Sequence, residues 1–209
     1  MRTKLEALVD RILLLYAVDR GNSHGTMDGP FKLMKIPFMA ELESVQHGVN
    51  TFSYTFYRYD HGPMTTEVYE DIEQLKAAGL LDVPENKCAQ IRLTTAGKKL
   101  FEHIDELFKS NSDVCRFIEQ SAQRYAGMPF GELKHVVYEQ RVRIGGRVMK
   151  VGDVPHYCDV IGKLQEDDVK RFEIDDDWID SLWGYFHYGP DELAARRCVR
   201  PMRLDAVTA

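Results

Sequence analysis

The spacing of apolar residues divides the first part of the chain into helices and an aromatic segment. In residues 3–19, apolar side chains recur at three- and four-residue steps, the pattern of a helix with one face in a core, and Gly21 is expected to end this helix. Pro30 suits the first turn of a second helix, which could kink at Pro37. The run 50–60 is rich in aromatic and β-favouring residues, and it predicts a strand or an extended arm.

A third helix and a hairpin follow. Thr65 or Thr66 can cap the helix, and Gly79 is expected to close it. Its apolar side consists of Val68, Ile72 and Leu75. A hairpin should then join residues 80–83 to residues 89–93, as the wing does in a winged-helix domain. These elements predict a helix-turn-helix unit with a wing.

The helical pattern continues to about residue 140. A long helix is predicted from Thr95 to Gln123, with an interruption around residues 110–112. Another helix is expected over 130–138. The fold class predicted for the chain is therefore α+β and mainly helical, with a winged helix-turn-helix domain in residues 1–140.

Residues 141–209 have a different character and form a predicted extension that packs on the first domain. Gly145-Gly146 lies between two β-favouring arms, which indicates a hairpin. Asp175-Asp176-Asp177 is placed to cap a helix that begins near Trp178. A last helix is expected from Pro190 to Arg197.

Composition narrows the class of protein. The chain of 209 residues, 44% of them hydrophobic, can bury one core, or one core with a small appended unit. Its four cysteines include no Cys-x-x-Cys pair, and no apolar run approaches the ~20 residues that span a bilayer. We therefore expect a reduced, cytoplasmic protein with no membrane segment.

Short motifs carry a resemblance to a known family. Ala77-Ala78-Gly79-Leu80-Leu81 and Leu93-Thr94-Thr95-Ala96-Gly97 are typical of winged helices. The run Tyr57-Arg58-Tyr59-Asp60-His61-Gly62-Pro63-Met64-Thr65, with Val68-Tyr69 beyond it, resembles the antitoxin-associated Panacea domain. The likeness covers roughly residues 5–140. It implies a regulatory or toxin-neutralising role, and it transfers no catalytic residue.

The third helix carries an acidic face opposite its apolar side. This face is made of Glu67, Glu70, Asp71, Glu73, Gln74 and Lys76. DNA binding depends on neutralising phosphates with Lys and Arg, so such a helix would be repelled from a duplex. The net charge of −6 means that the molecule as a whole does not attract the negatively charged DNA backbone. Two interpretations remain open, a solvated face or a docking face for a basic protein partner.

We therefore predict a non-enzymatic regulator that acts through protein contacts, its partner a basic toxin or effector. Aromatic side chains dominate interface hot spots, so the aromatic segment could anchor such a partner, although its residues could equally be core. The predicted partner-binding residues are Glu67, Glu70, Asp71, Glu73, Tyr57 and Tyr59. A homodimer through the long helix is a further expectation.

Sequence-specific DNA binding is the alternative function. Its candidate residues are Lys87 and Arg92 in the wing and Arg141, Arg143 and Lys150 in the later hairpin. Strand alternation around a two-residue turn would place the three hairpin cations on one face. They could instead pair with the acidic stretch at 166–177 inside the same chain, and we favour that pairing.

An enzyme with a dispersed active site is the third alternative. Asp60 and His61 beside Tyr57 could exchange protons, but a capping Asp and an exposed His explain the same residues. His156 and Cys158 lack a second pair of ligands for a metal. We find no phosphate-binding loop, nucleophile elbow or dinucleotide fingerprint. No catalytic residue, cofactor or metal site is therefore predicted.

Overall fold

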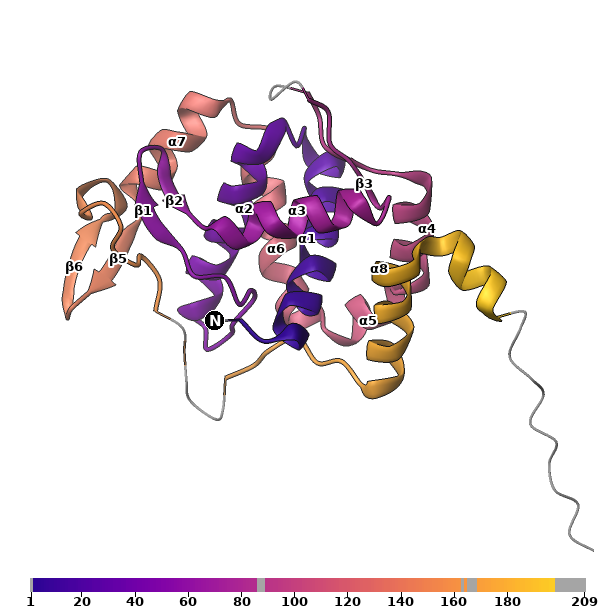
Figure 1. The fold of residues 1–209 in the computed structure, drawn as a ribbon. Helices are drawn as coiled ribbons and strands as arrows, with labels where there is room; N and C mark the ends of the chain where they lie inside the picture. Colours follow the sequence, from indigo (N-terminus) through magenta and orange to yellow (C-terminus); the bar gives the residue numbers. More distant parts are fainter. Residues whose placement is uncertain (1, 86–88, 163, 165–168, 198–209) are drawn as a thin grey trace, which may run out of the picture.

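A computed structural model describes residues 2–85, 89–162, 164 and 169–197 of the chain. It confirms an α+β fold in which helices dominate and the strands form small antiparallel pairs. The centre consists of α1 (Lys4–His24), α2 (Gly29–Val45) and α6 (Ser112–Tyr125), with α6 packed against both of the others (Figure 1). Within the described residues, no helix combines the length and apolar character needed to cross a bilayer.

The first helix is longer than the sequence indicates. Thr3 and Glu6 form a reciprocal capping box at its start, as the sequence pattern favours. The helix then continues through Gly21 to His24, so the expected stop at Gly21 is wrong. A Cβ at position 21 would lie 2.2 Å from the sulfur of Met27. Gly21 therefore serves close packing and does not terminate the helix.

The third helix follows the prediction. It is α3 (Thr66–Ala77), with the Thr65 side chain accepting a hydrogen bond from the Glu67 N–H, and Gly79 follows with φ +69°. The predicted hairpin is present as β3 (Leu81–Asp82) and β4 (Arg92–Leu93), paired antiparallel. Figure 1 shows α3 crossing in front of α1.

The predicted long helix is three helices. They are α4 (Thr95–His103), α5 (Asp105–Ser110) and α6. The break at residue 111 was expected, and a second one lies at Ile104. Asn111 is buried, and its side chain exchanges hydrogen bonds with the backbone N–H and carbonyl of Glu173. The apolar side of α6 is used inside the chain, so a single long helix for dimer contacts is not present.

The aromatic segment is mostly an extended arm. Only β1 (Tyr57–Tyr59) is a strand, paired with β2 (Gly62–Met64). Residues 50–56 lie along α1, α2 and α3, and carboxylates satisfy several of their backbone N–H groups. The acceptors are Glu41 for Thr51 and Phe52, Asp10 for Ser53, and Glu67 for Thr55. The arm is held without a sheet because side chains replace the ladder bonds.

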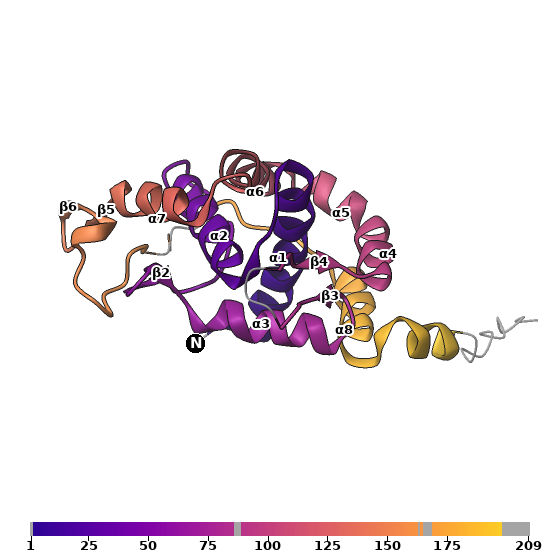
Figure 2. The same cartoon turned by 90° about the horizontal axis from the view of Figure 1, so that it is seen from above.

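The extension is joined to the first part of the chain through backbone pairing. It begins after α7 (Phe130–Glu139) with β5 (Arg141–Ile144), β6 (Arg147–Lys150) and the short 3₁₀ helix η1 (Val151–Asp153). Residues 157–160 then pair with residues 56–58, and Asn50 N–H donates to the Lys170 carbonyl. α7 and the β5–β6 hairpin lie at one end of the molecule, and α4, α5 and α8 (Asp176–Arg197) lie at the other (Figure 1, Figure 2).

The last described element is α8 (Asp176–Arg197), a single helix where two were expected. It starts beside the predicted Asp175-Asp176-Asp177 cap, where Asp175 accepts a hydrogen bond from the Trp178 N–H. Pro190 lies inside α8 and does not begin a new helix. A proline within a helix removes one backbone bond and bends it, and Figure 1 shows α8 changing direction in its second half.

Candidate functional site

The β1–β2 hairpin brings the longest sequence motif of the chain to one side of a groove. Tyr59 pairs with Gly62 across the turn, and Gly62 has φ +95°, which a residue with a side chain rarely adopts. A Cβ at Gly62 would also lie 3.7 Å from the Lys35 amine. The turn therefore needs glycine and sets Tyr59 and His61 beside the second helix.

The groove lies between α2, the hairpin, α3 and α7. Its volume is about 730 Å³, and it is lined by Asp28, Pro30, Phe31, Met34, Lys35, Tyr59, His61, Gly62, Met64, Tyr69 and Phe130. Tyr69 is 41% exposed and Phe130 is 51% exposed. Large apolar side chains are seldom left exposed together without a role in binding, so this groove is the candidate functional site.

A third exposed ring extends the aromatic surface. Tyr157 is 73% exposed, and its ring centre lies 5.8 Å from that of Tyr59 and 6.4 Å from that of Tyr57. Its backbone has φ +65°, a conformation that costs free energy for any residue with a Cβ. The Tyr157 N–H donates to the Arg58 carbonyl at 2.8 Å, which holds this conformation. Strain of this kind is often found at binding sites.

The floor of the groove carries a buried amine. Lys35 is 3% exposed, its Nζ donates to the Pro63 carbonyl, and its charge lies 5.0 Å from the centre of the Phe31 ring. Burial, with smaller contributions from the charges of Arg58 and Lys134, lowers its pKa to about 7. The amine therefore titrates near neutral pH.

Arg58 is a second buried cation near Lys35. It is 7% exposed, donates from Nε to the Val151 carbonyl at 3.2 Å, and lies over the Tyr138 ring at 4.7 Å. Its Nη1 has no hydrogen-bond acceptor among the described residues. No described carboxylate lies within ion-pair distance of either cation. When Lys35 is protonated, the floor of the groove thus carries a positive charge that no described carboxylate compensates.

Asp71 does not lie on an exposed acidic face, contrary to the prediction. It is 1% exposed and accepts hydrogen bonds from Arg2 at 2.6 Å, Arg11 at 3.1 Å and the Tyr54 hydroxyl at 2.9 Å. Asp10 shares Arg2 with it at 2.8 Å. This buried ion cluster joins the N-terminal segment, α1, the arm and α3, so Asp71 has a structural role.

The remaining acidic residues of α3 divide into two kinds. Glu67 is half-buried and is committed to the Thr55 N–H at 2.9 Å and the Thr65 hydroxyl at 3.2 Å. Glu70 and Glu73 are exposed and have no ion-pair partner within the described part of the chain. Only these two carboxylates, next to Tyr69 on the same helix, are available to a partner.

The cations of the DNA-binding alternative do not form one patch. Arg141, Arg143 and Lys150 share a face of the β5–β6 hairpin as expected, because Arg141 pairs with Lys150 in the register. Lys150 bonds Glu139 at 2.6 Å, and it has no ion pair with the described part of the acidic stretch, residues 169–177. Arg92 bonds Gln90, and Lys87 lies outside the described residues. Figure 1 and Figure 2 place the β3–β4 and β5–β6 hairpins far apart.

The residues considered for catalysis do not come together in one site. Asp60 is 3.5 Å from His156, and both side chains are largely exposed. Cys115 was not a candidate from the sequence, and it is buried. Burial raises the pKa of its thiol to about 12, which makes it a poor nucleophile. Across the described ranges, no group of three or more His, Cys, Asp or Glu side chains could hold a metal ion.

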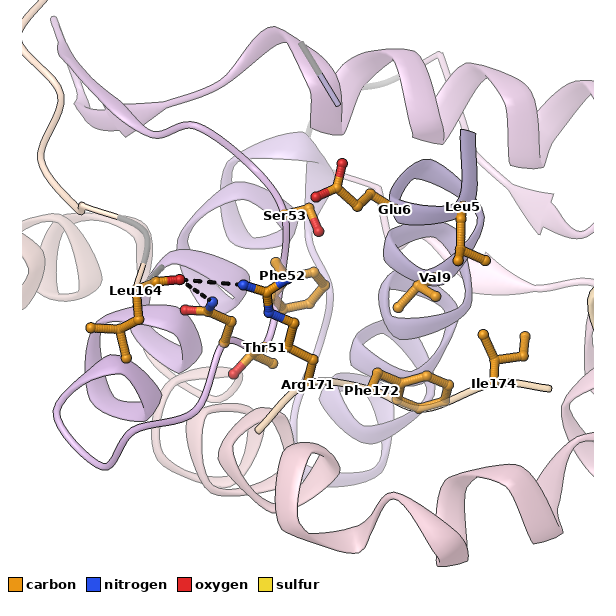
Figure 3. Close-up of a pocket in the computed structure, with 11 residues that line it drawn as sticks. Leu5, Glu6, Val9, Thr51, Phe52, Ser53, Leu164, Arg171, Phe172 and Ile174 are labelled. Atoms are coloured by element: carbon orange, nitrogen blue, oxygen red, sulfur yellow. Dashed lines mark hydrogen bonds between the residues drawn. The ribbon is translucent and has the colours of Figure 1, made fainter. Parts of the chain in front are cut away.

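A second hollow lies where the extension crosses the arm. Figure 3 shows the Arg171 guanidinium directed at the carbonyl oxygen of Leu164, 3.5 Å away, with Phe52 behind it and Val9 and Phe172 to one side. Asn50 donates to the same carbonyl at 3.0 Å. The polar groups named here form hydrogen bonds between segments of the same chain. This hollow of about 360 Å³ is therefore a packing contact between the arm and the extension, and we do not take it as a binding site.

Several residues of the groove were not recognised from the sequence. Tyr59 was predicted, whereas Phe31, Lys35, Tyr69 and Phe130 were not. In the aromatic surface beside the groove, Tyr57 was predicted and Tyr157 was not. The signal for Lys35 was a charged residue inside an otherwise apolar helical run, between Met34 and Ile36. The other aromatics come from α2, α3, α7 and the loop after η1, and they share no sequence pattern.

Comparison of the chain with family models, with curated proteins and with solved structures found no match in any of the three.

Proposed function

We propose that this chain is a non-enzymatic winged-helix regulator, antitoxin-like in its role, that captures a protein partner in the aromatic groove. The observation that carries the proposal is the exposure of Tyr69 and Phe130 on the walls of an open cavity of about 730 Å³, with the exposed ring of Tyr157 packed beside Tyr59, another of its lining residues. Exposed tyrosine and phenylalanine side chains beside a cavity supply the apolar area and the pockets that hot spots need.

The order of the elements supports the winged-helix assignment. α3 is followed directly by the β3–β4 hairpin, and the Thr94 N–H donates to the Leu80 carbonyl at 3.0 Å. A Cβ at Gly97 would lie 2.2 Å from the same carbonyl oxygen. The two short motifs that suggested a winged helix therefore pack on each other, with Gly97 allowing the contact.

The position of α3 supports a partner that is basic next to the groove. Tyr69 lines the groove, while Glu70 and Glu73 lie exposed on the same helix. A partner segment anchored in the groove would extend across these carboxylates, which favour Lys or Arg. The same charges disfavour a nucleic acid at this surface.

Affinity capture from a native lysate, with and without nuclease, tests the proposal when two variants are compared. The double variant Tyr69→Ala/Phe130→Ala removes two exposed rings, and Val148→Ala removes an exposed apolar side chain outside the groove. We expect a nuclease-resistant protein to be retained by wild type and by Val148→Ala and lost at least tenfold by the double variant. Equal retention by all three proteins would contradict the proposal.

Charge reversal tests the acidic side of the surface. Glu70→Lys with Glu73→Lys should weaken capture severalfold without affecting the fold, because both side chains are exposed. The buried Asp71 is unsuitable for this purpose. Unchanged capture would restrict the binding surface to the groove itself.

Duplex DNA binding is the second candidate, favoured by the common face of Arg141 and Arg143 on an exposed hairpin. It predicts an affinity that falls steeply with salt and is lost in Arg141→Gln/Arg143→Gln. Failure of the protein to bind a duplex even at low salt would contradict this second function.

A further inference from the structure

We propose that the groove binds a carboxylate-bearing peptide segment of the partner, with the carboxylate against Lys35 and an aromatic or aliphatic side chain against the surrounding rings. The inference rests on the proposed function and specifies its ligand. It predicts a chemical preference that can be measured without knowing the partner.

The first argument is the uncompensated charge at the floor of the groove. Buried cations are normally paired, because an ammonium removed from water loses its hydration. Lys35 has the Pro63 carbonyl and the Phe31 ring, neither of which carries a negative charge. Arg58 lies close enough to oppose the charge of Lys35 and has an unused Nη1. A bound anion would supply the missing charge.

The second argument is the charge of the remaining groups that face Lys35. Lys134 of α7 is half-buried, and its Nζ lies 3.4 Å from Nδ1 of His61 at the hairpin turn. Asp28 is the acidic residue among those lining the groove. Its carboxylate lies 3.3 Å from the Lys32 amine, so its charge is already paired with Lys32 and not with Lys35. The groove therefore presents positive charge around its floor.

The third argument concerns the size and nature of the anion. The walls are apolar, with Phe31, Met34 and Phe130 near the floor, which suits a side chain next to the anionic group. A polyanion such as nucleic acid would meet Glu70 and Glu73 beside the groove, whereas a single carboxylate on Lys35 would not. An acidic residue or a terminal carboxylate in a peptide fits both conditions.

A matched pair of fragments tests the inference on the wild-type protein. N-acetyl-L-phenylalanine carries the carboxylate, and N-acetyl-L-phenylalaninamide has the same ring without the charge. We expect an NMR titration of isotope-labelled protein at pH 6.5 to shift signals of groove residues, with the acid binding about tenfold more tightly than the amide. Equal affinities, or shifts confined to residues outside the groove, would overturn the inference.

Variants locate the preference. Lys35→Met should reduce the acid-to-amide ratio to about one, and Lys134→Gln should lower it severalfold, while Lys109→Gln on the distant α5 should leave it unchanged (Figure 1). If Lys35→Met does not fold, the wild-type ratio and Lys134→Gln decide the question. A preference that survives in every variant would place the carboxylate elsewhere and overturn the inference.

The two proposals fail in distinguishable ways. Equal affinity for acid and amide, together with loss of partner capture in Tyr69→Ala/Phe130→Ala, would overturn the carboxylate inference and support the partner-binding function. A tenfold preference for the acid with capture unaffected by that double variant would support the anion site and contradict the function.

Discussion

Lys35 is a buried amine whose environment favours its neutral form. Its pKa is about 7, against an ordinary value of 10.5, because burial and the nearby charges of Arg58 and Lys134 disfavour the ammonium. Between these two values the unfolded chain binds more protons at this position than the folded chain does. The free energy of unfolding therefore falls as the pH is lowered from 10.5 towards 7. The contribution of Lys35 to folding stability is complete above pH 10.5 and is lost once the pH has fallen through 7.

The Lys35→Met variant tests this dependence. The free energy of unfolding of wild type minus that of the variant should rise between pH 7 and pH 10, by up to about 1.4 kcal/mol per pH unit. Urea unfolding of both proteins at pH 7, 8 and 9 measures the difference, in which contributions common to the two proteins cancel. A flat or falling difference would show that the amine keeps its ordinary titration.

Arg2 stabilises the fold through two buried carboxylates. Its guanidinium lies 2.8 Å from Asp10 and 2.6 Å from Asp71, which are 0% and 1% exposed. Removing one member of a buried ion cluster leaves uncompensated charge, so Arg2→Met should destabilise the protein by about 3 kcal/mol. The exposed Lys4 provides the control, since Lys4→Met should change stability by less than ~0.5 kcal/mol. Chemical denaturation measures the free energy of unfolding of both variants. Equal values for the two would show that the ion cluster does not stabilise the fold.

At the scale of single residues, the sequence distinguished apolar from polar positions but not structural from accessible carboxylates. Glu67, Glu70, Asp71 and Glu73 have the same charge on one helix, although Asp71 follows Val68 by three positions and precedes Leu75 by four, which places it at the edge of the apolar side. Whether each is exposed depends on Arg2 and on the arm, which approach α3 from distant positions in the chain. Such long-range contacts leave no local pattern in the sequence.

At the scale of elements, a pair of glycines tests how the hairpin and α4 pack. A Cβ at Gly97 would meet the Leu80 carbonyl oxygen at 2.2 Å, while a Cβ at Gly131 meets nothing within 4 Å. Gly97→Ala should destabilise the protein by about 1–3 kcal/mol through steric overlap. Gly131→Ala, in the exposed face of α7, should stabilise it by up to about 1 kcal/mol. Thermal unfolding measures both, and a neutral Gly97→Ala would show that the contact is looser than described.

Elements with local signals were predicted well. Thr65 at the cap of α3, the register of β5 and β6 around Gly145-Gly146, and the helix at 130–138 all follow from neighbouring residues. For residues 50–56 the sequence left a strand and an extended arm open, because the carboxylates of three helices that satisfy the arm's N–H groups are distant in the sequence. The break at Ile104 likewise had no turn residue to indicate it.

At the scale of the whole molecule, the extension contributes to the core. Leu182 of α8 is 0% exposed, and Phe172 packs against the ring of Phe108 of α5 at 6.4 Å between centres. The groove also depends on the extension, since Tyr157 is held beside the hairpin by pairing of residues 157–160 with residues 56–58. The sequence indicated an extension that packs on the first domain, but it could not indicate that the extension borders the binding surface.

Leu182→Ala tests whether the extension folds with the rest of the chain. Truncation of a fully buried leucine should cost about 2–5 kcal/mol, and it should lower the midpoint of one cooperative transition. Calorimetry distinguishes this result from the alternative, in which there are two transitions and the substitution lowers the midpoint of only one of them. The latter outcome would mean that residues beyond 140 unfold separately.

Site-specific photo-cross-linking tests the central claim, that the groove between α2, the β1–β2 hairpin, α3 and α7 is the surface that holds a protein partner. A photoreactive phenylalanine analogue would replace Phe130 in the groove, and a second protein would carry it at the exposed Lys109 of α5 as a control. We predict that irradiation in native lysate yields a single nuclease-resistant protein adduct from position 130 and none from position 109. The same adducts from both positions, or none from position 130, would contradict the account.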